Sequence, residues 1–178
     1  MASEALLLDV GKVILDVTAP ALEAFADATG TTPDGPRAGF ESEIAFFRAV
    51  AEVAVDLMFD QDAVALMRDA HTAGFRVGVL SNDAYSIMGR EFFAARREFA
   101  HVDAFVDAVD IGVRKPEAEA YRHAAEALGV APESVVFLDD TPECVEGART
   151  VGMHAIQVDP AARRTAFALA REALGIPV

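Results

Sequence analysis

Short apolar runs alternate along the chain with segments whose apolar positions recur every three to four residues. The runs lie at residues 5–10, 75–80, 104–109, 135–138 and 155–158. Each is bounded by Gly, Asp, Ser or Pro, which is typical of buried parallel strands. The periodic segments predict helices over 60–73, 116–128, 142–151 and 160–174. Strands that alternate with helices predict an α/β fold, a doubly wound parallel five-stranded sheet covered on both faces.

One segment interrupts this alternation, because residues 16–57 separate the first two predicted strands by more than a simple crossover needs. Its middle, residues 29–39, is rich in turn residues, and 41–59 follows as an amphipathic helix with a wide apolar face. That face fits either a helix packed in the core, or a surface that forms a small cap or contacts a second copy of the chain in a homodimer. We divide the chain into a core domain, residues 1–15 and 58–178, and a small helical cap, residues 16–57.

Composition limits the partners and the compartment. Apolar residues make up 53% of the chain, and 29 acidic against 15 basic residues give a net charge of −14. This balance argues against nucleic acid or an anionic membrane as a partner, since both attract basic surfaces. The single cysteine, Cys144, cannot form an intrachain disulfide. No signal peptide or membrane-spanning run is recognisable, so we expect a cytoplasmic protein.

Residues suited to phosphate and metal chemistry lie at or shortly after the carboxyl ends of four of the predicted strands. They are Asp9, Ser81, Asn82, Lys115, Asp139 and Asp140. Ligands of open parallel sheets bind at the carboxyl ends of the strands, so we expect these residues on one rim. Carboxylates hold Mg²⁺, while hydroxyl, amide and ammonium groups bind phosphate oxygens. The chain has 13 arginines and only two lysines, and both Lys12 and Lys115 fall in these loops, which favours point-charge contacts with phosphate.

At these residues the chain resembles the haloacid dehalogenase-like (HAD) superfamily, in its phosphatase branch, with a shortened cap after the first strand. Four motifs in the expected order carry the resemblance: LLLDVGKVILD (6–16), VLSND (79–83), VRKPE (113–117) and VFLDDTPECVEGARTVGM (136–153). The resemblance implies a Rossmann-like core. It also implies a Mg²⁺-dependent phosphomonoester hydrolase that acts on a small phosphometabolite through an aspartyl-phosphate intermediate.

The resemblance assigns a nucleophile and a metal site. Asp9 would attack phosphorus and form the aspartyl-phosphate. Asp9, the Gly11 carbonyl and Asp140 would hold Mg²⁺. Asp139 would lie beside the metal, either as an outer ligand or as the group that orients bound water.

The resemblance also assigns the substrate contacts. Ser81 and the backbone of Asn82 would bind phosphoryl oxygens. Lys115 would neutralise the charge between Asp9 and the phosphate.

One departure from the family pattern concerns proton transfer. Most phosphatases of this family carry Asp two residues after the nucleophile, as the general acid for the leaving group, and here that residue is Gly11. A positioned acid typically contributes about 10²–10⁴ in rate. Asp16, Asp83 and Glu143 are the candidate replacements, and the sequence prefers none of them.

A second departure is Cys144, which stands four residues after Asp140 where the family usually has Asp or Asn. A thiol is a poor ligand for Mg²⁺, and we expect Cys144 to be a small buried residue of the helix over 142–151. Gly11, Cys144 and the short cap favour an alternative function, a catalytically degenerate protein that binds a ligand without turnover.

A further alternative is a metal-independent 2-haloacid dehalogenase, whose relatives also lack the second Asp and attack carbon with the same carboxylate. That activity would need a cap arginine for the substrate carboxylate, and Arg37 and Arg48 are the candidates. The Asp139-Asp140 pair argues against it, because two more negative charges beside Asp9 call for a compensating cation.

Overall fold

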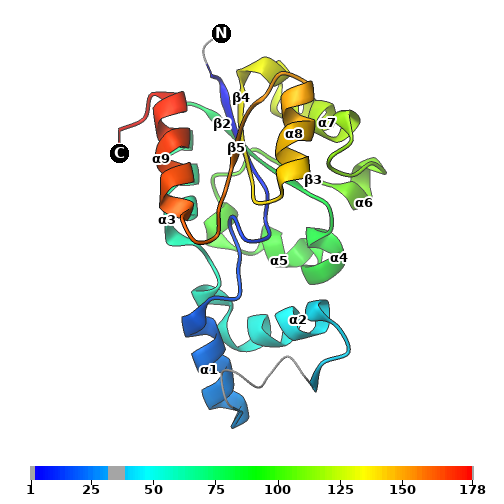
Figure 1. Cartoon of the computed structure of the whole chain (residues 1–178), viewed down its shortest axis with the longest axis vertical. Coiled ribbons are helices and arrows are strands. Elements are labelled where there is room, and N and C mark those ends of the chain that lie inside the picture. Colours follow the sequence, from blue (N-terminus) through cyan, green and yellow to red (C-terminus); the bar gives the residue numbers. More distant parts are fainter. Residues whose placement is uncertain (1–2, 32–38, 178) are drawn as a thin grey trace. The chain divides into compact units, whose positions relative to one another are not determined.

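The computed structural model describes residues 3–31 and 39–177. Contacts between residues divide the chain into two compact units, residues 1–14 with 61–178, and residues 15–60 (Figure 1). The first unit contains all five strands. The interpretation of residues 16–57 as a cap stays a prediction.

The described elements follow one another in α/β order. They are β1 (Ala5–Leu8), α1 (Ala19–Thr29), α2 (Glu43–Ala54), η2 (Val55–Leu57), α3 (Gln61–Thr72), β2 (Arg76–Ser81), α4 (Ala84–Met88), α5 (Arg90–Ala94), η3 (Arg97–Phe99), β3 (Ala104–Asp107), α6 (Ala108–Ile111), α7 (Ala118–Leu128), η4 (Pro132–Ser134), β4 (Val135–Asp139), α8 (Pro142–Thr150), β5 (His154–Gln157) and α9 (Arg163–Leu174). The η elements are single 3-10 turns.

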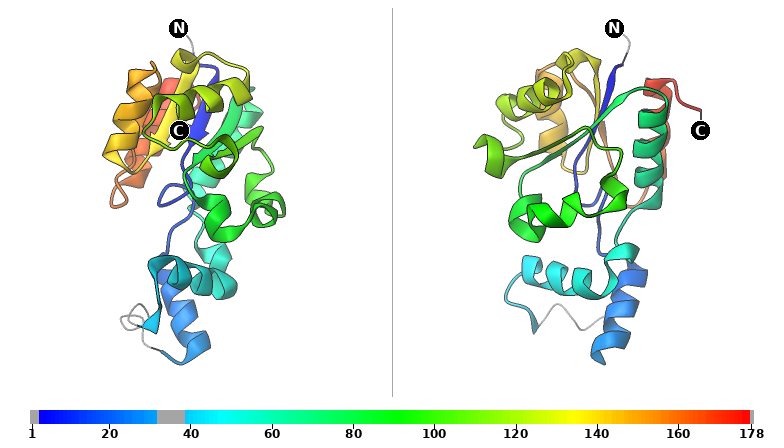
Figure 2. Two further views of the ribbon diagram at one scale, coloured as in Figure 1. Left: turned by 90° about the vertical axis from the view of Figure 1, so that its right-hand side faces the viewer. Right: turned by 180° about the vertical axis from the view of Figure 1, so that it is seen from behind.

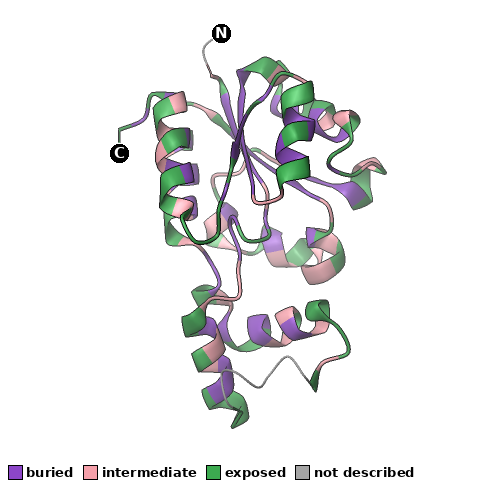
Figure 3. Cartoon of the chain, viewed as in Figure 1, coloured by how far each residue is buried: buried purple, intermediate pink, exposed green. Residues whose placement is uncertain are grey.

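The predicted five-stranded parallel sheet is confirmed, with strand order β3-β2-β1-β4-β5. Helices α7 and α8 pack on one face and α3 and α9 on the other, so the sheet is doubly wound (Figure 2). The strands are mostly buried, whereas the outward sides of these helices are exposed (Figure 3). None of the helices formed by the described residues is long and apolar enough to cross a membrane.

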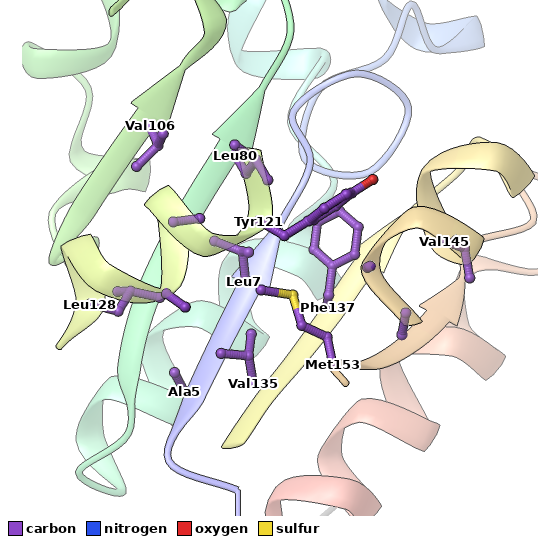
Figure 4. Close-up of a cluster of buried hydrophobic side chains, with 14 residues drawn as sticks. Ala5, Leu7, Leu80, Val106, Tyr121, Leu128, Val135, Phe137, Val145 and Met153 are labelled. Atoms are coloured by element: carbon purple, nitrogen blue, oxygen red, sulfur yellow. The ribbon is translucent and has the colours of Figure 1, made fainter. Parts of the chain in front are cut away.

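The core between the sheet and α7 and α8 centres on Tyr121 and Phe137, both fully buried (Figure 4). Their rings meet edge to face with centroids 5.6 Å apart, a favoured aromatic geometry. The Tyr121 hydroxyl donates a 2.6 Å hydrogen bond to the Cys144 carbonyl, which satisfies the one polar atom of that side chain. This bond ties α7 to the first turn of α8, which follows the candidate residues Asp139 and Asp140.

Several predicted boundaries differ from the structure by two residues or more, and an aspartate explains two of these differences. The third strand ends at Asp107 rather than at 109, because the Asp107 carboxylate accepts a hydrogen bond from Val109 N and starts the short helix α6. The last helix begins at Arg163 rather than at 160, since Asp159 accepts from Ala161 N and holds a turn before it. Side chains that cap the following backbone favour turns over continued strands or helices.

The unit of residues 15–60 contains a helix that the hydrophobic pattern did not predict. Helix α1 has Thr18 as its N-cap, Pro20 in its first turn and the left-handed Gly30 as its C-cap, so its capping signals were present in the sequence. The segment 29–39, predicted as turn-rich, lies largely outside the described residues.

The predicted helix over 41–59 is α2 followed by the 3-10 turn η2. Phe46 and Val50 are buried, and the Phe46 ring lies 6.1 Å from Phe25 of α1, centroid to centroid. Ile44 and Val53 remain 45% and 46% exposed. The homodimer through this helix therefore stays a prediction that concerns only its exposed apolar positions.

Candidate active site

The carboxyl end of β1 lies at the centre of the sheet. The strands that follow β1 in the chain are added on opposite sides of it, β2 and β3 on one side and β4 and β5 on the other. Leu8 pairs with Val79 of β2 and with Leu138 of β4. Asp9 follows directly, and its N–H donates to the Leu138 carbonyl at 2.9 Å. The neighbour after Leu138 is Asp139, so the register alone brings these two carboxylates together. Open α/β sheets bind ligands at such a switch point.

A buried lysine joins these two carboxylates. Lys115 Nζ lies 2.6 Å from Oδ1 of Asp9 and 2.6 Å from Oδ2 of Asp139, and its side chain is only 3% exposed. Burial by itself would lower the pKa of Lys115, but the two adjacent carboxylates outweigh it and hold that pKa above its ordinary value. Lys115 is therefore a permanent cation within the site.

The Asp9 carboxyl is the titratable acid of this group. Burial raises the pKa of Asp9 to about 6, a rise that Lys115 opposes and the negative charge of Asp139 reinforces. The Oδ2 atom of Asp9 faces Gly11, since a Cβ atom built on that glycine would lie 3.8 Å from it. One Asp9 oxygen thus contacts the buried cation, and the other lies toward the loop that follows β1.

The two aspartates at the end of β4 have different surroundings. Asp139 is 1% exposed and uses both oxygens within the protein, one for Lys115 and one to accept from Thr141 N at 2.9 Å. Asp140 is 15% exposed, and its Oδ2 lies 3.3 Å from Nζ of the exposed Lys12. Asp139 is thus committed to internal bonds, while Asp140 meets a cation at the surface.

Carboxylate oxygens of Asp9, Asp139 and Asp140 all lie within 4.8 Å of one another. Oxygen ligands from one or two carboxylates suit Mg²⁺, which usually keeps several waters. The oxygen donors of these three aspartates therefore fit a divalent cation. Among the described residues they form the only His, Cys, Asp or Glu group that meets this geometry.

The loop after β2 holds the backbone of Lys115 in place. Asn82 Nδ2 donates to the Lys115 carbonyl at 3.1 Å, and Lys115 N donates to Asn82 Oδ1 at 2.8 Å. Ser81 is buried, and its Oγ accepts from the backbone N–H groups of Asp83 and Ala84. The topology of a parallel sheet predicts that Asn82 and Lys115 lie on the same rim, but the two-way amide contact with the Lys115 backbone was not anticipated.

Two further residues shape the site and were missed in the sequence. Asp107, fully buried at the end of β3, accepts from Tyr85 N and so anchors the first turn of α4 next to Ser81. Gly147 in α8 lies very close to Pro116, the residue after Lys115. A Cβ atom on Gly147 would come 2.5 Å from the Pro116 carbonyl oxygen. Asp107 is an aspartate inside a run predicted as a buried strand, which was a usable signal, whereas the close approach at Gly147 is a tertiary contact.

The structure describes most of the remaining candidate residues. Cys144 is buried, as expected, and that burial raises its pKa to about 11, so the thiol stays protonated. Asp83 and Glu143 are exposed residues of the first unit, and Asp16 belongs to the other unit. Arg37, a candidate for binding a haloacid, lies outside the described residues.

The combination of a doubly wound sheet and a carboxylate–lysine cluster at its switch point defines the class of this protein. A family model described as haloacid dehalogenase-like hydrolase matches residues 22–152. The chain therefore belongs to the haloacid dehalogenase-like hydrolase family.

Individual relatives agree with this assignment. Phosphatase MT3486 of Mycobacterium tuberculosis is 39% identical over 98 residues, which cover 55% of this chain and 45% of that protein. The chain thus spans about half the length of that curated relative. A HAD phosphatase from Thermococcus onnurineus is similar in structure with a TM-score of 0.65 and 19% identity, covering 97% of this chain and 98% of that one. An L-2-haloacid dehalogenase from Xanthobacter autotrophicus gives a TM-score of 0.63 and 21% identity over 97% of this chain and 83% of its own. Both structures support the fold alone.

Proposed function

We propose that this chain is a Mg²⁺-dependent phosphomonoester hydrolase that acts on a small phosphometabolite through an aspartyl-phosphate on Asp9. The observation that carries the proposal is the grouping of Asp9, Lys115 and Asp139 at the centre of the sheet, with Asp140 beside them. Residues 16–57 would serve as the cap that selects the substrate.

The first step would use the Asp9 carboxylate as nucleophile. One of its oxygens attacks phosphorus, the bond from phosphorus to the ester oxygen breaks, and the leaving alkoxide takes up a proton. Water then attacks phosphorus, which releases inorganic phosphate and returns Asp9 to its carboxylate form. Lys115, held 2.6 Å from Asp9, would balance the negative charge that gathers there as the phosphoryl group approaches.

The metal would be held by Asp9, Asp140 and the Gly11 carbonyl. When bound, Mg²⁺ would neutralise phosphoryl charge and orient the group for in-line attack. The internal bonds of Asp139 to Lys115 and Thr141 support an outer role for that residue, in which it positions the lysine rather than the metal.

Ser81 and Asn82 would bind the phosphoryl oxygens. The Ser81 oxygen already accepts two backbone N–H groups, which orients its hydroxyl and leaves its proton to donate to an oxygen of the substrate. The side chain of Asn82 is committed to the Lys115 backbone, so its backbone N–H is the group for phosphate.

The dehalogenase alternative uses the same carboxylate but no metal. The three clustered carboxylates outnumber the two lysines that contact them, Lys115 and Lys12, which favours a site that takes up a further cation. Halide release is the competing outcome in the activity test.

A phosphate-release screen over a panel of phosphometabolites, with Mg²⁺ and with a chelator, tests the proposal. Release should require Mg²⁺ and should vanish in Asp9→Asn, while the circular dichroism spectrum of that variant stays unchanged. Release of halide from 2-chloropropionate in the same format would favour the dehalogenase. Absence of both activities would favour the degenerate binding protein, and undiminished phosphate release by Asp9→Asn would overturn the nucleophile.

A further inference from the structure

The loop after β1 carries a lysine in an unusual backbone conformation. Lys12 has φ +55°, and it is the only described residue other than glycine with a positive φ. Left-handed backbone is disfavoured for side chains with a Cβ atom. The Lys12 carbonyl accepts a 3.0 Å hydrogen bond from Nε of Arg163, which helps to hold the loop in this conformation.

The side chain of Lys12 ends at one of the candidate metal ligands. Its Nζ lies 3.3 Å from Oδ2 of Asp140, and its side chain is 61% exposed whereas that of Asp140 is 15% exposed. Lys12 thus has a fixed backbone and an ammonium group in contact with solvent. An ion pair of this kind is weak and easily exchanged, because water screens it and the side chain retains rotational freedom.

The two lysines of the site differ in whether they can leave it. Lys115 is 3% exposed and bonds two carboxylates at 2.6 Å, so its departure would leave buried negative charge unpaired. Lys12 can move into solvent at little cost. A divalent cation bound to Asp140 would compete with the Lys12 ammonium for that carboxylate, and the two positive charges would repel each other.

We propose that Lys12 is a displaceable counter-ion of the site, which pairs with Asp140 in the metal-free protein and lowers the affinity for the divalent cation. The inference rests on the metal site of the proposed function, and it concerns a residue to which that function assigns no role. It predicts that a neutral residue at position 12 tightens Mg²⁺ binding, because neither the competing ion pair nor the repulsion remains.

Isothermal titration of Mg²⁺ into the whole protein tests this inference. Lys12→Asn and Lys12→Gly remove the charge and keep residues that accept a positive φ. We expect both variants to bind Mg²⁺ roughly three- to tenfold more tightly than the wild type, from the loss of one exposed ion pair and one like-charge contact. Lys12→Arg keeps the charge and should stay within about twofold of the wild type.

A matched control separates a local effect from a change in net charge. Arg164→Gln removes one positive charge whose partner is Asp62 rather than the carboxylate cluster, and it should leave Mg²⁺ affinity unchanged. Damage to the loop would weaken binding, so tighter binding cannot come from a structural defect. Unchanged or weaker Mg²⁺ binding in both neutral variants would overturn the inference, and so would a wild type that binds no Mg²⁺.

A second readout follows the lysine itself. Reductive methylation with ¹³C-formaldehyde keeps the positive charge and should label Lys12 and the terminal amine, since the only other lysine, Lys115, is buried. The Lys12 signal, identified by its loss in Lys12→Asn, should shift as Mg²⁺ is added. A signal that does not move while calorimetry shows saturation would overturn the displacement. Phosphate release, measured separately with Asp140→Asn as its negative control, decides the proposed function independently of Lys12.

Discussion

Replacing Lys115 with methionine removes the cation shared by two carboxylates and keeps a flexible side chain of similar length. The ammonium lies 2.6 Å from both Asp9 and Asp139, and the lysine side chain is 3% exposed. Removing one partner of a buried ion pair leaves uncompensated charge, so we expect Lys115→Met to lose about 3–5 kcal/mol of the free energy of unfolding at neutral pH. For a chain of this size that loss corresponds to roughly 10 °C in Tm.

The loss should shrink as the pH falls. Burial already raises the pKa of Asp9, and Lys115 opposes that rise, so without the lysine the folded-state pKa of Asp9 should move further above its ordinary value. The folded variant then binds protons before the unfolded chain does, so its stability rises as the pH falls through that pKa. The wild type should show a smaller rise of the same sign, because Lys115 limits the rise in the pKa of Asp9 to about 6, while the raised pKa of Lys115 keeps the ion pair intact throughout this range.

Urea unfolding followed by far-UV circular dichroism measures this loss, since the chain has no tryptophan. Arg122→Met, which removes an exposed ion pair with Glu119, is the matched control and should lose only a small fraction as much. The double variant Asp9→Asn/Lys115→Met should lose less than Lys115→Met alone, because one negative charge is already gone. A loss below about 1 kcal/mol near pH 8, or an equal loss near pH 5, would refute this reasoning.

Three further outcomes test the site and its packing. Phosphate release should fall as the pH drops below about 6, because burial raises the pKa of Asp9 to about 6 and only the carboxylate attacks phosphorus; a flat kcat/KM profile would contradict this. Gly11→Asp should raise turnover of alkyl phosphates by up to about 10²–10⁴, since Gly11 has no positive φ and a Cβ there meets only Asp9 at 3.8 Å. Equal rates for alkyl and aryl phosphates in the wild type, with phosphoryl transfer limiting, would show that another acid already acts. Gly147→Ala should destabilise the fold by about 1–3 kcal/mol in urea, because its Cβ would lie 2.5 Å from the Pro116 carbonyl oxygen, whereas Gly39→Ala meets nothing within 4 Å and should be neutral.

The sheet and its site loops could be predicted because their signals are local. Buried parallel strands read as short apolar runs, and the residues after them share one edge by topology, as Asp9 and Asp139 do. Boundaries were less accurate where a side chain caps the backbone, as Asp107 does at the end of β3. Helix α1 was missed because its alanines lie on all sides of the helix and obscure the apolar periodicity, although Thr18 and Gly30 mark its two ends.

Contacts between loops are the part that a single sequence does not supply. The two-way amide contact of Asn82 with the Lys115 backbone depends on which loops are neighbours, and so does the close approach of Gly147 to Pro116. The motif assigned a charge-balancing role to Lys115, but its bond to Asp139 as well as to Asp9 follows only from the three-dimensional structure.

Trapping the covalent intermediate tests the central claim most directly. The protein would be mixed with Mg²⁺ and a phosphomonoester that it cleaves, quenched in acid during turnover, digested and analysed by mass spectrometry. We expect one phosphoryl group on the peptide that contains Asp9, removable by hydroxylamine as an acyl phosphate is, and no such group in Asp9→Asn. Turnover by the wild type at a rate limited by breakdown of the intermediate, with no phosphoryl group on Asp9 or with the group on another residue, would contradict the account.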